Sequence, residues 1–178
     1  MLVRFVRIFL AALLLGCTSE KPKGWIDGER LFKDDSREWL AVGGNYLMQH
    51  YSPLNEITAE NVSQLGFAWE YDARSTIGTV HRGLEATPIV VDGIMYTSGA
   101  WGFVYALDAK TGKELWWFGP HVDAAYARRA CCDAVNRGVA VWEGKVYVGT
   151  LDGYLVCLDG ATGAVHWRVD TFTDRTRA

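Results

Sequence analysis

Short apolar runs alternate with polar, glycine-containing turns between residues 87 and 118. The runs cover residues 87–91, 94–98, 103–108 and 114–118, and each has the length of a β-strand. Asp92-Gly93 separates the first two runs, and this dipeptide is typical of a two-residue hairpin turn. The pattern therefore predicts four antiparallel strands joined by short turns.

The same pattern returns 51 residues later, in a second unit that covers residues 138–169. The matched positions are Gly93 and Gly144, Tyr96 and Tyr147, Gly102 and Gly153, Gly112 and Gly163, and Trp116 and Trp167. Self-similarity at such a period is typical of a propeller or solenoid, and four antiparallel strands make one propeller blade. The sequence thus predicts an all-β fold, a partial β-propeller over residues 39–178 that holds about two and a half blades.

The turn before the last strand of each unit has a recurring composition. In the first unit, Asp108 and Thr111 can hydrogen-bond to the local backbone, and Gly112 can adopt a positive φ. Trp116 then offers a large flat surface on which the neighbouring unit can stack. We interpret Trp69, Trp116 and Trp167 as structural residues that close successive blades, with Trp69 ending an earlier, incomplete one.

The N-terminus has the features of an export signal. Arg4 and Arg7 precede a short apolar stretch from Ile8 to Leu15, and residues 1–16 are predicted to be a signal peptide. Gly16-Cys17 after leucines resembles a bacterial lipobox, which implies that Cys17 is lipidated. An ordinary signal peptide with an incidental Cys17 and an uncleaved anchor are the alternatives, and all three export the chain. Residues 17–38 are then a tether and N-terminal segment.

The stretch from Trp25 to Leu40, which begins in that segment, could form a short helix. Composition narrows the class of protein further. The 178 residues carry a net charge of −3, with 49% hydrophobic and 22% charged residues, which excludes a disordered chain and a basic nucleic-acid-binding arm. No apolar run has the roughly 20 residues of a membrane-spanning helix. Eight Trp, eight Tyr and 19 Gly support short strands and tight turns.

Three further segments resemble the quinoprotein dehydrogenases, which carry pyrroloquinoline quinone (PQQ) on an eight-bladed propeller. The segments are Trp39 to Asp72, Gly83-Leu84-Glu85-Ala86-Thr87-Pro88, and Ala130-Cys131-Cys132-Asp133-Ala134-Val135-Asn136-Arg137-Gly138. The repeat itself is similar to the family's tryptophan-docking motif. Within the family, the chain is most similar to the alcohol dehydrogenase branch, which includes quinohaemoprotein forms. The resemblance implies PQQ as cofactor and an alcohol as substrate.

The resemblance also assigns cofactor contacts. Arg137 matches the arginine that contacts the quinone oxygens, and its planar fork suits adjacent oxygens. Glu85 matches the glutamate that contacts the cofactor, and Val135 is expected to shape the same pocket. Asn136 is expected only to hold the loop. A surface arginine and a solvated loop glutamate are the plain alternatives for Arg137 and Glu85.

Cys131 and Cys132 are adjacent, with Cα atoms about 3.8 Å apart, below the usual disulfide range. From the residues alone, two free thiols or a bond to another cysteine remain open, and no zinc spacing is evident. The resemblance implies a vicinal disulfide between them that presses on one face of the cofactor. Cys157, which takes the place of Ala106 in the repeat, is predicted to be a buried core residue.

In the family, a Ca²⁺ ion polarises the quinone and an aspartate acts as general base. No segment of this chain matches either, so both the Ca²⁺ ligands and the base are expected downstream. We therefore predict the N-terminal part of a longer periplasmic dehydrogenase, inactive by itself, whose electron acceptor is a protein such as a cytochrome c. The alternative is a non-catalytic propeller lipoprotein that docks other proteins at the outer membrane.

Overall fold

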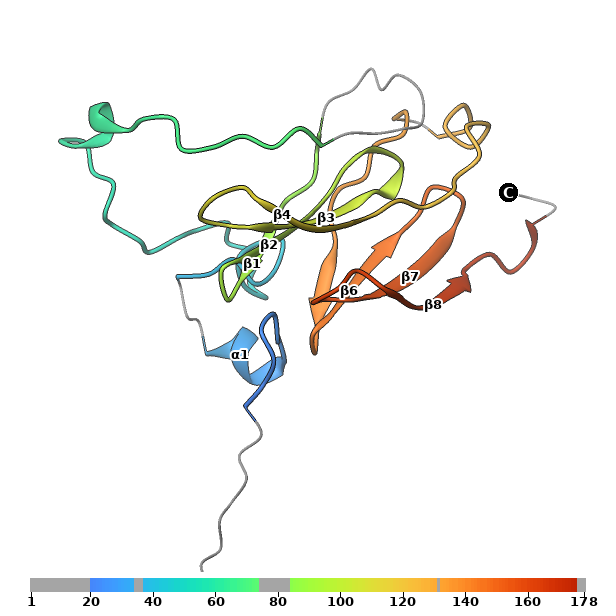
Figure 1. The fold of residues 1–178 in the computed structure, drawn as a ribbon, viewed down its shortest axis with the longest axis horizontal. Coiled ribbons are helices and arrows are strands. Elements are labelled where there is room, and N and C mark those ends of the chain that lie inside the picture. Colours follow the sequence, from blue (N-terminus) through green and yellow to red (C-terminus); the bar gives the residue numbers. More distant parts are fainter. Residues whose placement is uncertain (1–19, 34–36, 74–83, 131, 176–178) are drawn as a thin grey trace, which may run out of the picture.

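The computed structural model describes residues 20–33, 37–73, 84–130 and 132–175, which form two four-stranded antiparallel sheets standing side by side (Figure 1). The first sheet contains β1 (Ile89–Val91), β2 (Ile94–Ser98), β3 (Val104–Asp108) and β4 (Glu114–Phe118). The second contains β5 (Ala140–Trp142), β6 (Lys145–Gly149), β7 (Tyr154–Asp159) and β8 (Val165–Asp170). In both sheets the spatial order follows the chain order. The predicted all-β fold of repeated four-stranded units is confirmed.

The hairpins that open the two sheets have the turn geometry that the sequence predicts. Asp92 and Gly93 have φ angles of 51° and 76°, and Glu143 and Gly144 have φ angles of 47° and 71°. Positive φ at both central residues is the mark of a type I′ turn, whose twist matches that of the flanking strands. The turns set the register, with Val91 opposite Ile94 in the first sheet.

The helical content is small. Asp27 caps the N-terminus of helix α1 (Gly28–Phe32), because its carboxylate accepts a hydrogen bond from the Arg30 N–H. Two 3₁₀ turns cover Val62–Gln64 (η1) and Ala100–Gly102 (η2). The predicted helix between Trp25 and Leu40 is therefore wrong in length. Trp39 instead exchanges two backbone hydrogen bonds with Val90, so the chain is extended there and pairs with β1.

Tryptophans of one unit lie on glycines of the next. A Cβ built on Gly112 would come within 2.5 Å of the Trp69 ring, and one on Gly163 within 2.6 Å of the Trp116 ring. The indole N–H of Trp116 also donates to the carbonyl of Gly160 at 2.9 Å. Trp69 and Trp116 thus each pack against the glycine turn of the following unit, whereas the equivalent Trp167 is 42% exposed.

The main core fills the space between the two sheets. Its fully buried members include Ile89, Tyr96, Val104, Val146 and Leu158. Cys157 is also fully buried, which confirms its predicted place in the core, and burial raises the pKa of its thiol. Because strand residues of both sheets share this core, the two blades pack as one body.

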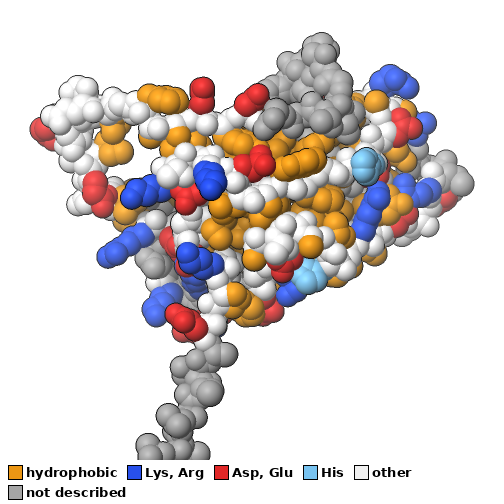
Figure 2. All heavy atoms as spheres, in the orientation of Figure 1, with side chains coloured by type: hydrophobic (Ala, Val, Ile, Leu, Met, Phe, Trp, Pro, Cys, Tyr) orange, Lys and Arg blue, Asp and Glu red, His pale blue; other side chains and the backbone are white. Residues whose placement is uncertain are grey.

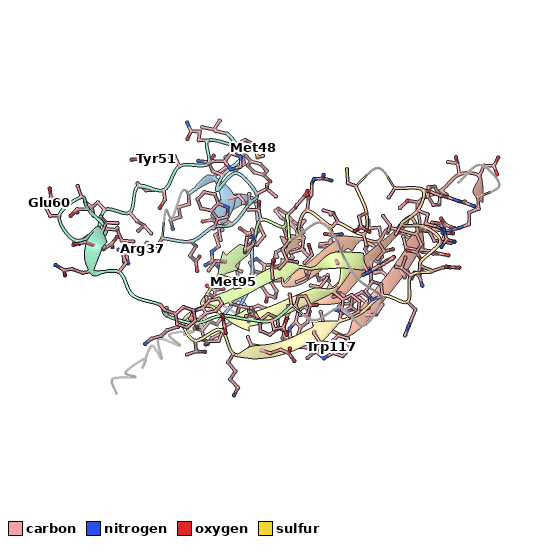
Figure 3. The ribbon with its side chains drawn as sticks, turned by 90° about the horizontal axis from the view of Figure 1, so that it is seen from above. Arg37, Met48, Tyr51, Glu60, Met95 and Trp117 are labelled. Atoms are coloured by element: carbon pink, nitrogen blue, oxygen red, sulfur yellow. The ribbon has the colours of Figure 1, made fainter. Side chains whose placement is uncertain are left out.

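Helix α1 is attached to the first hairpin by charge. Arg30 donates to Asp92 at 2.7 and 3.1 Å, and it also pairs with Glu38. Residues 43–50 form a loop closed by the His50 N–H on the Gly43 carbonyl, and Met48 lies in this loop near α1 (Figure 3). Residues 51–67 then form an arm that extends away from the sheets and carries Tyr51 and Glu60. Hydrophobic side chains lie exposed on the arm and also over the sheets (Figure 2).

Among the described residues, no helix has the length and apolar character needed to cross a membrane.

Candidate functional site

Two loops meet where the first strand of each sheet begins. The segment 84–88 leads into β1 and the segment 132–138 leads into β5. Thr87 and Gly138 form a parallel bridge, and the Thr87 N–H donates to the Arg137 carbonyl at 3.3 Å. We call this junction of segments 84–88 and 132–138 the rim site, because it lies at one end of both sheets.

The rim site brings together two of the residues that the sequence predicts for cofactor binding. Arg137 Nη2 lies 3.2 Å from Glu85 Oε2, although the two residues are far apart in the sequence. The side chains remain 65% and 41% exposed, respectively. An ion pair this exposed adds about 0–1 kcal/mol to stability, so it does little for the fold. It does present a planar cation and a carboxylate to an incoming molecule.

Trp101, for which the sequence analysis made no prediction, holds the backbone of segment 132–138 by a hydrogen bond. The N–H of Trp101, in η2, donates to the Ala134 carbonyl at 2.7 Å, and both residues are buried. Trp101 has a φ of 64°, which is uncommon for a bulky residue. Asp133 in the loop itself has a φ of 64° as well. The only available signal was an aromatic residue next to Gly102 in a predicted turn.

The structure describes some of the remaining predicted site residues and leaves others outside the described part of the chain. Val135 and Cys132 are half-buried in the same loop as Arg137. Cys131 lies outside the described residues, so the vicinal disulfide with Cys132 stays a prediction. Cys17, the predicted lipidation site, and the predicted signal peptide at residues 1–16 also lie outside the described residues. Among the residues that the structure describes, no group of three or more His, Cys, Asp or Glu could hold a metal ion.

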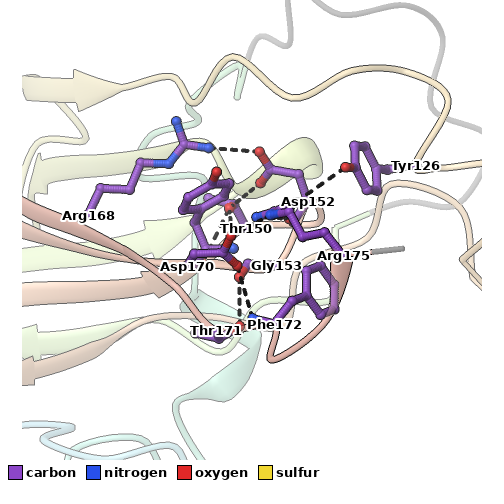
Figure 4. A network of polar contacts seen from close by, with 10 residues as sticks. Tyr126, Thr150, Asp152, Gly153, Arg168, Asp170, Thr171, Phe172 and Arg175 are labelled. Atoms are coloured by element: carbon purple, nitrogen blue, oxygen red, sulfur yellow. Dashed lines mark hydrogen bonds and ion pairs between the residues drawn. The ribbon is translucent and has the colours of Figure 1, made fainter. Parts of the chain in front are cut away.

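A polar network fixes the second sheet at the same end as the rim site (Figure 4). The buried carboxylate of Asp152 accepts hydrogen bonds from Thr150 and, at 2.8 Å, from Arg168. Arg175 donates to the Asp152 carbonyl at 3.3 Å and to the Tyr126 hydroxyl at 3.4 Å. The network therefore ties the loop before the rim site to the segment that follows β8.

The two arginines of this network also contact other residues. Arg175 hydrogen-bonds to Asp170 and holds the pKa of that carboxyl below its usual range. The guanidinium of Arg168 lies 3.5 Å from the centroid of the Tyr154 ring, a cation–π arrangement. These contacts give the end of the second sheet a set shape without adding an unpaired buried charge. The sequence analysis made no prediction for any of these residues.

Comparison with known proteins identifies one family. A family model described as "PQQ: Glucose/ethanol/alcohol dehydrogenase, beta-propeller domain" matches residues 39–177. Quinohemoprotein alcohol dehydrogenase ADH-IIG of Pseudomonas putida is 51% identical over 155 residues, which is 86% of this chain and 21% of that protein. 1-Butanol dehydrogenase (cytochrome c) of Thauera butanivorans is 50% identical over 137 residues, 77% of this chain and 19% of that protein.

Solved structures agree with the sequence relatives. The crystal structure of quinohemoprotein alcohol dehydrogenase from Comamonas testosteroni superposes with a TM-score of 0.77 at 46% identity. The match covers 84% of this chain and 22% of that one. The chain thus spans about one fifth of the length of the curated relatives that it matches.

Proposed function

The chain belongs to the PQQ-type glucose/ethanol/alcohol dehydrogenase β-propeller family. From this premise we propose that it forms part of the cofactor-binding site of an alcohol-oxidising enzyme. The rim site carries the proposal. There, segments from two successive blades meet, and Arg137 lies 3.2 Å from Glu85 with both side chains accessible. Neither side chain is needed for packing, which supports a role in binding.

The residues of the rim site suit PQQ in charge and shape. PQQ carries three carboxylates and an ortho-quinone, so it needs fixed cations and hydrogen-bond donors. The guanidinium of Arg137 is permanently charged, and its planar fork matches adjacent oxygens. The 132–138 backbone that carries it is tied to Trp101 and Thr87, so the attachment point of the guanidinium is fixed, and Glu85 lies 3.2 Å from Arg137 Nη2. The residues present therefore fit the cofactor.

Each residue has a distinct part in this proposal. When bound, PQQ would be the oxidant that accepts a hydride from the alcohol carbon. Arg137 binds and orients the oxygen-rich edge of the cofactor, and Glu85 holds the guanidinium in place from the neighbouring segment. Val135 contributes to the wall of the site, and a Cys131–Cys132 disulfide would provide a rigid surface against one face of the ring.

The rest of the proposal concerns the whole protein. Relatives named for alcohols and for cytochrome c support an alcohol substrate and a cytochrome-type electron acceptor. Ca²⁺ would be held by residues beyond those described. The pattern of residues 1–16, which predicts a signal peptide, supports a periplasmic location, and Cys17 would carry a lipid anchor.

A cofactor titration tests the proposal on the full-length protein. We expect PQQ to quench tryptophan fluorescence with a saturable binding curve. Arg137→Lys should raise the PQQ dissociation constant by about 10- to 100-fold, because lysine cannot form a bidentate contact and one charge-assisted hydrogen bond is worth about 1.5–3 kcal/mol. The Kd comes from the fluorescence titration at fixed ionic strength.

Arg37→Lys is the matched control, because Arg37 is also exposed but lies near the arm, away from the rim site (Figure 3). It should bind PQQ like the wild type. A protein that folds but shows no saturable quenching would remove the enzyme proposal and favour the docking-scaffold alternative. Equal affinities of the two variants would remove Arg137 from the site and leave the family assignment intact.

A further inference from the structure

The side-chain amide of Asn136 makes three hydrogen bonds next to Arg137. Its Oδ1 accepts from the Ser98 hydroxyl at 2.6 Å and from the Gly138 N–H at 3.1 Å. Its Nδ2 donates to the Gly149 carbonyl at 2.9 Å. The amide cannot be reversed without placing an oxygen against the Gly149 carbonyl. Its orientation is therefore set by its three partners.

The repeat explains what these partners have in common. Ser98 ends β2 and Gly149 ends β6, and the two positions are 51 residues apart, the repeat period of the chain. Asn136 therefore bridges equivalent points of two successive blades. Ser98 is only 2% exposed, so its hydroxyl is a fixed partner rather than a solvated one. An asparagine suits this place because it can accept and donate at once.

The same repeat relates Asn136 to the other half of the rim site. The position 51 residues before Asn136 is Glu85. At this position the second blade carries Asn136, whose amide joins the two blades, and the first blade carries Glu85, whose carboxylate faces Arg137. Asn136 therefore supports the structure of the rim site, whereas the partly exposed Glu85 can meet a ligand.

Backbone contacts on both sides of Arg137 complete the arrangement. Asn136 is fixed through its amide, the Gly138 N–H is bound to that amide, and the Arg137 carbonyl accepts from Thr87. The backbone from which the Arg137 side chain leaves is therefore held by the Arg137 carbonyl, by the Gly138 N–H and by the side chain of Asn136. Such support is what keeps an exposed ligand-binding group within a fraction of an ångström of its working position.

We infer that Asn136 and Ser98 are positioning residues that fix Arg137 for PQQ binding. The inference rests on the proposed function. It differs from a merely structural role in one respect: removal of the Asn136 amide or of the Ser98 hydroxyl should weaken PQQ binding through Arg137, beyond any effect on the stability of the blades.

The test is a double-mutant cycle on the full-length protein, with PQQ as the probe and tryptophan quenching as the readout. Asn136→Ala should raise the Kd for PQQ by about tenfold, and Ser98→Ala by about three- to tenfold, the range expected for one hydrogen bond. Both effects should largely disappear in an Arg137→Lys background, because coupled residues are not additive. Thermal unfolding without PQQ records the structural cost separately.

Asn61→Ala is the matched control. The Asn61 amide also makes two hydrogen bonds of 2.7 Å, to Glu56 and Thr58, but it lies on the arm. It should leave the Kd unchanged. If Asn136→Ala does not fold, Ser98→Ala carries the test, since it removes a single hydroxyl.

The outcomes separate the inference from the proposed function. If the wild type binds PQQ and Arg137→Lys weakens binding, but Ser98→Ala and Asn136→Ala leave the Kd unchanged, the inference is overturned and the proposed function stands. The same holds if their effects are fully additive with Arg137→Lys. A wild type that does not bind PQQ overturns both.

Discussion

Gly163→Ala is expected to lower the free energy of unfolding by about 3 kcal/mol or more. Gly163 has a φ of 73°, which costs a residue with a side chain about 1–2 kcal/mol. The new Cβ would also lie 2.6 Å from the Trp116 ring. Trp116 would have to move, which breaks its hydrogen bond to Gly160 and opens a gap between the blades. Chemical denaturation of wild type and variant measures the difference.

Two other glycines separate the contributions to this loss. Gly93 has a φ of 76°, but a Cβ there would meet nothing within 4 Å, so Gly93→Ala reports the backbone cost alone. Gly66 has neither a positive φ nor a close neighbour, so Gly66→Ala should be nearly neutral. If Gly163→Ala costs no more than Gly93→Ala, the tryptophan contact does not hold the two blades together.

The second large effect is a loss of stability at alkaline pH that depends on Tyr96. Tyr96 is fully buried between the blades, and its hydroxyl donates to the Gly160 carbonyl at 3.0 Å. Burial, assisted by the charges of Asp159 and Asp92, raises its pKa to about 12. In the unfolded chain a tyrosine has a pKa of about 10. The unfolded state therefore releases this proton first as the pH rises.

The sign of the effect follows from that difference. Stability from the protonated hydroxyl is fully present below pH 10 and is lost as the pH rises through 12, for a total of about 2–3 kcal/mol. Tyr96→Phe should cost about 1 kcal/mol at pH 7 but should lack this alkaline loss. Unfolding curves between pH 8 and pH 12 measure both. Tyr46→Phe, at an exposed position, should follow the wild-type pH dependence, and the same slope in Tyr96→Phe would contradict the assignment.

The strands and their order could be predicted because the necessary signals are local. Asp92-Gly93 dictates a tight hairpin, and the apolar runs on either side have strand length. The 51-residue repeat then predicts the same strands in the second unit. The packing of Trp116 against Gly163 is a finding of the structure, because the repeat predicts only that the neighbouring unit stacks on the indole. Glu85 and Arg137 were predicted from resemblance, and the structure brings them within 3.2 Å.

The supports of the rim site could not be predicted in the same way. The positive φ of Trp101 is imposed by a hydrogen bond to Ala134, 33 residues later in the chain, and nothing in the indole favours that conformation. One of the three partners of the Asn136 side chain is Ser98, and nothing in the sequence marks this serine at the end of β2 as such a partner. The helix was predicted too long because pairing of Trp39 with Val90 outweighs the weak local preference. In each case, a distant contact decides the local geometry.

Docking of each tryptophan on a later glycine has a consequence for synthesis on the ribosome. Gly112 follows Trp69 by 43 residues, and Gly163 follows Trp116 by 47. At 5–20 residues per second, each indole therefore waits about 2–9 s before its glycine has been made. Because the chain is predicted to be exported, each indole also leaves the translocation channel before its glycine, so a large apolar ring stays uncovered until the next unit has followed. We expect the blades to assemble in chain order, with each unfinished face staying open until the glycine of the following unit arrives.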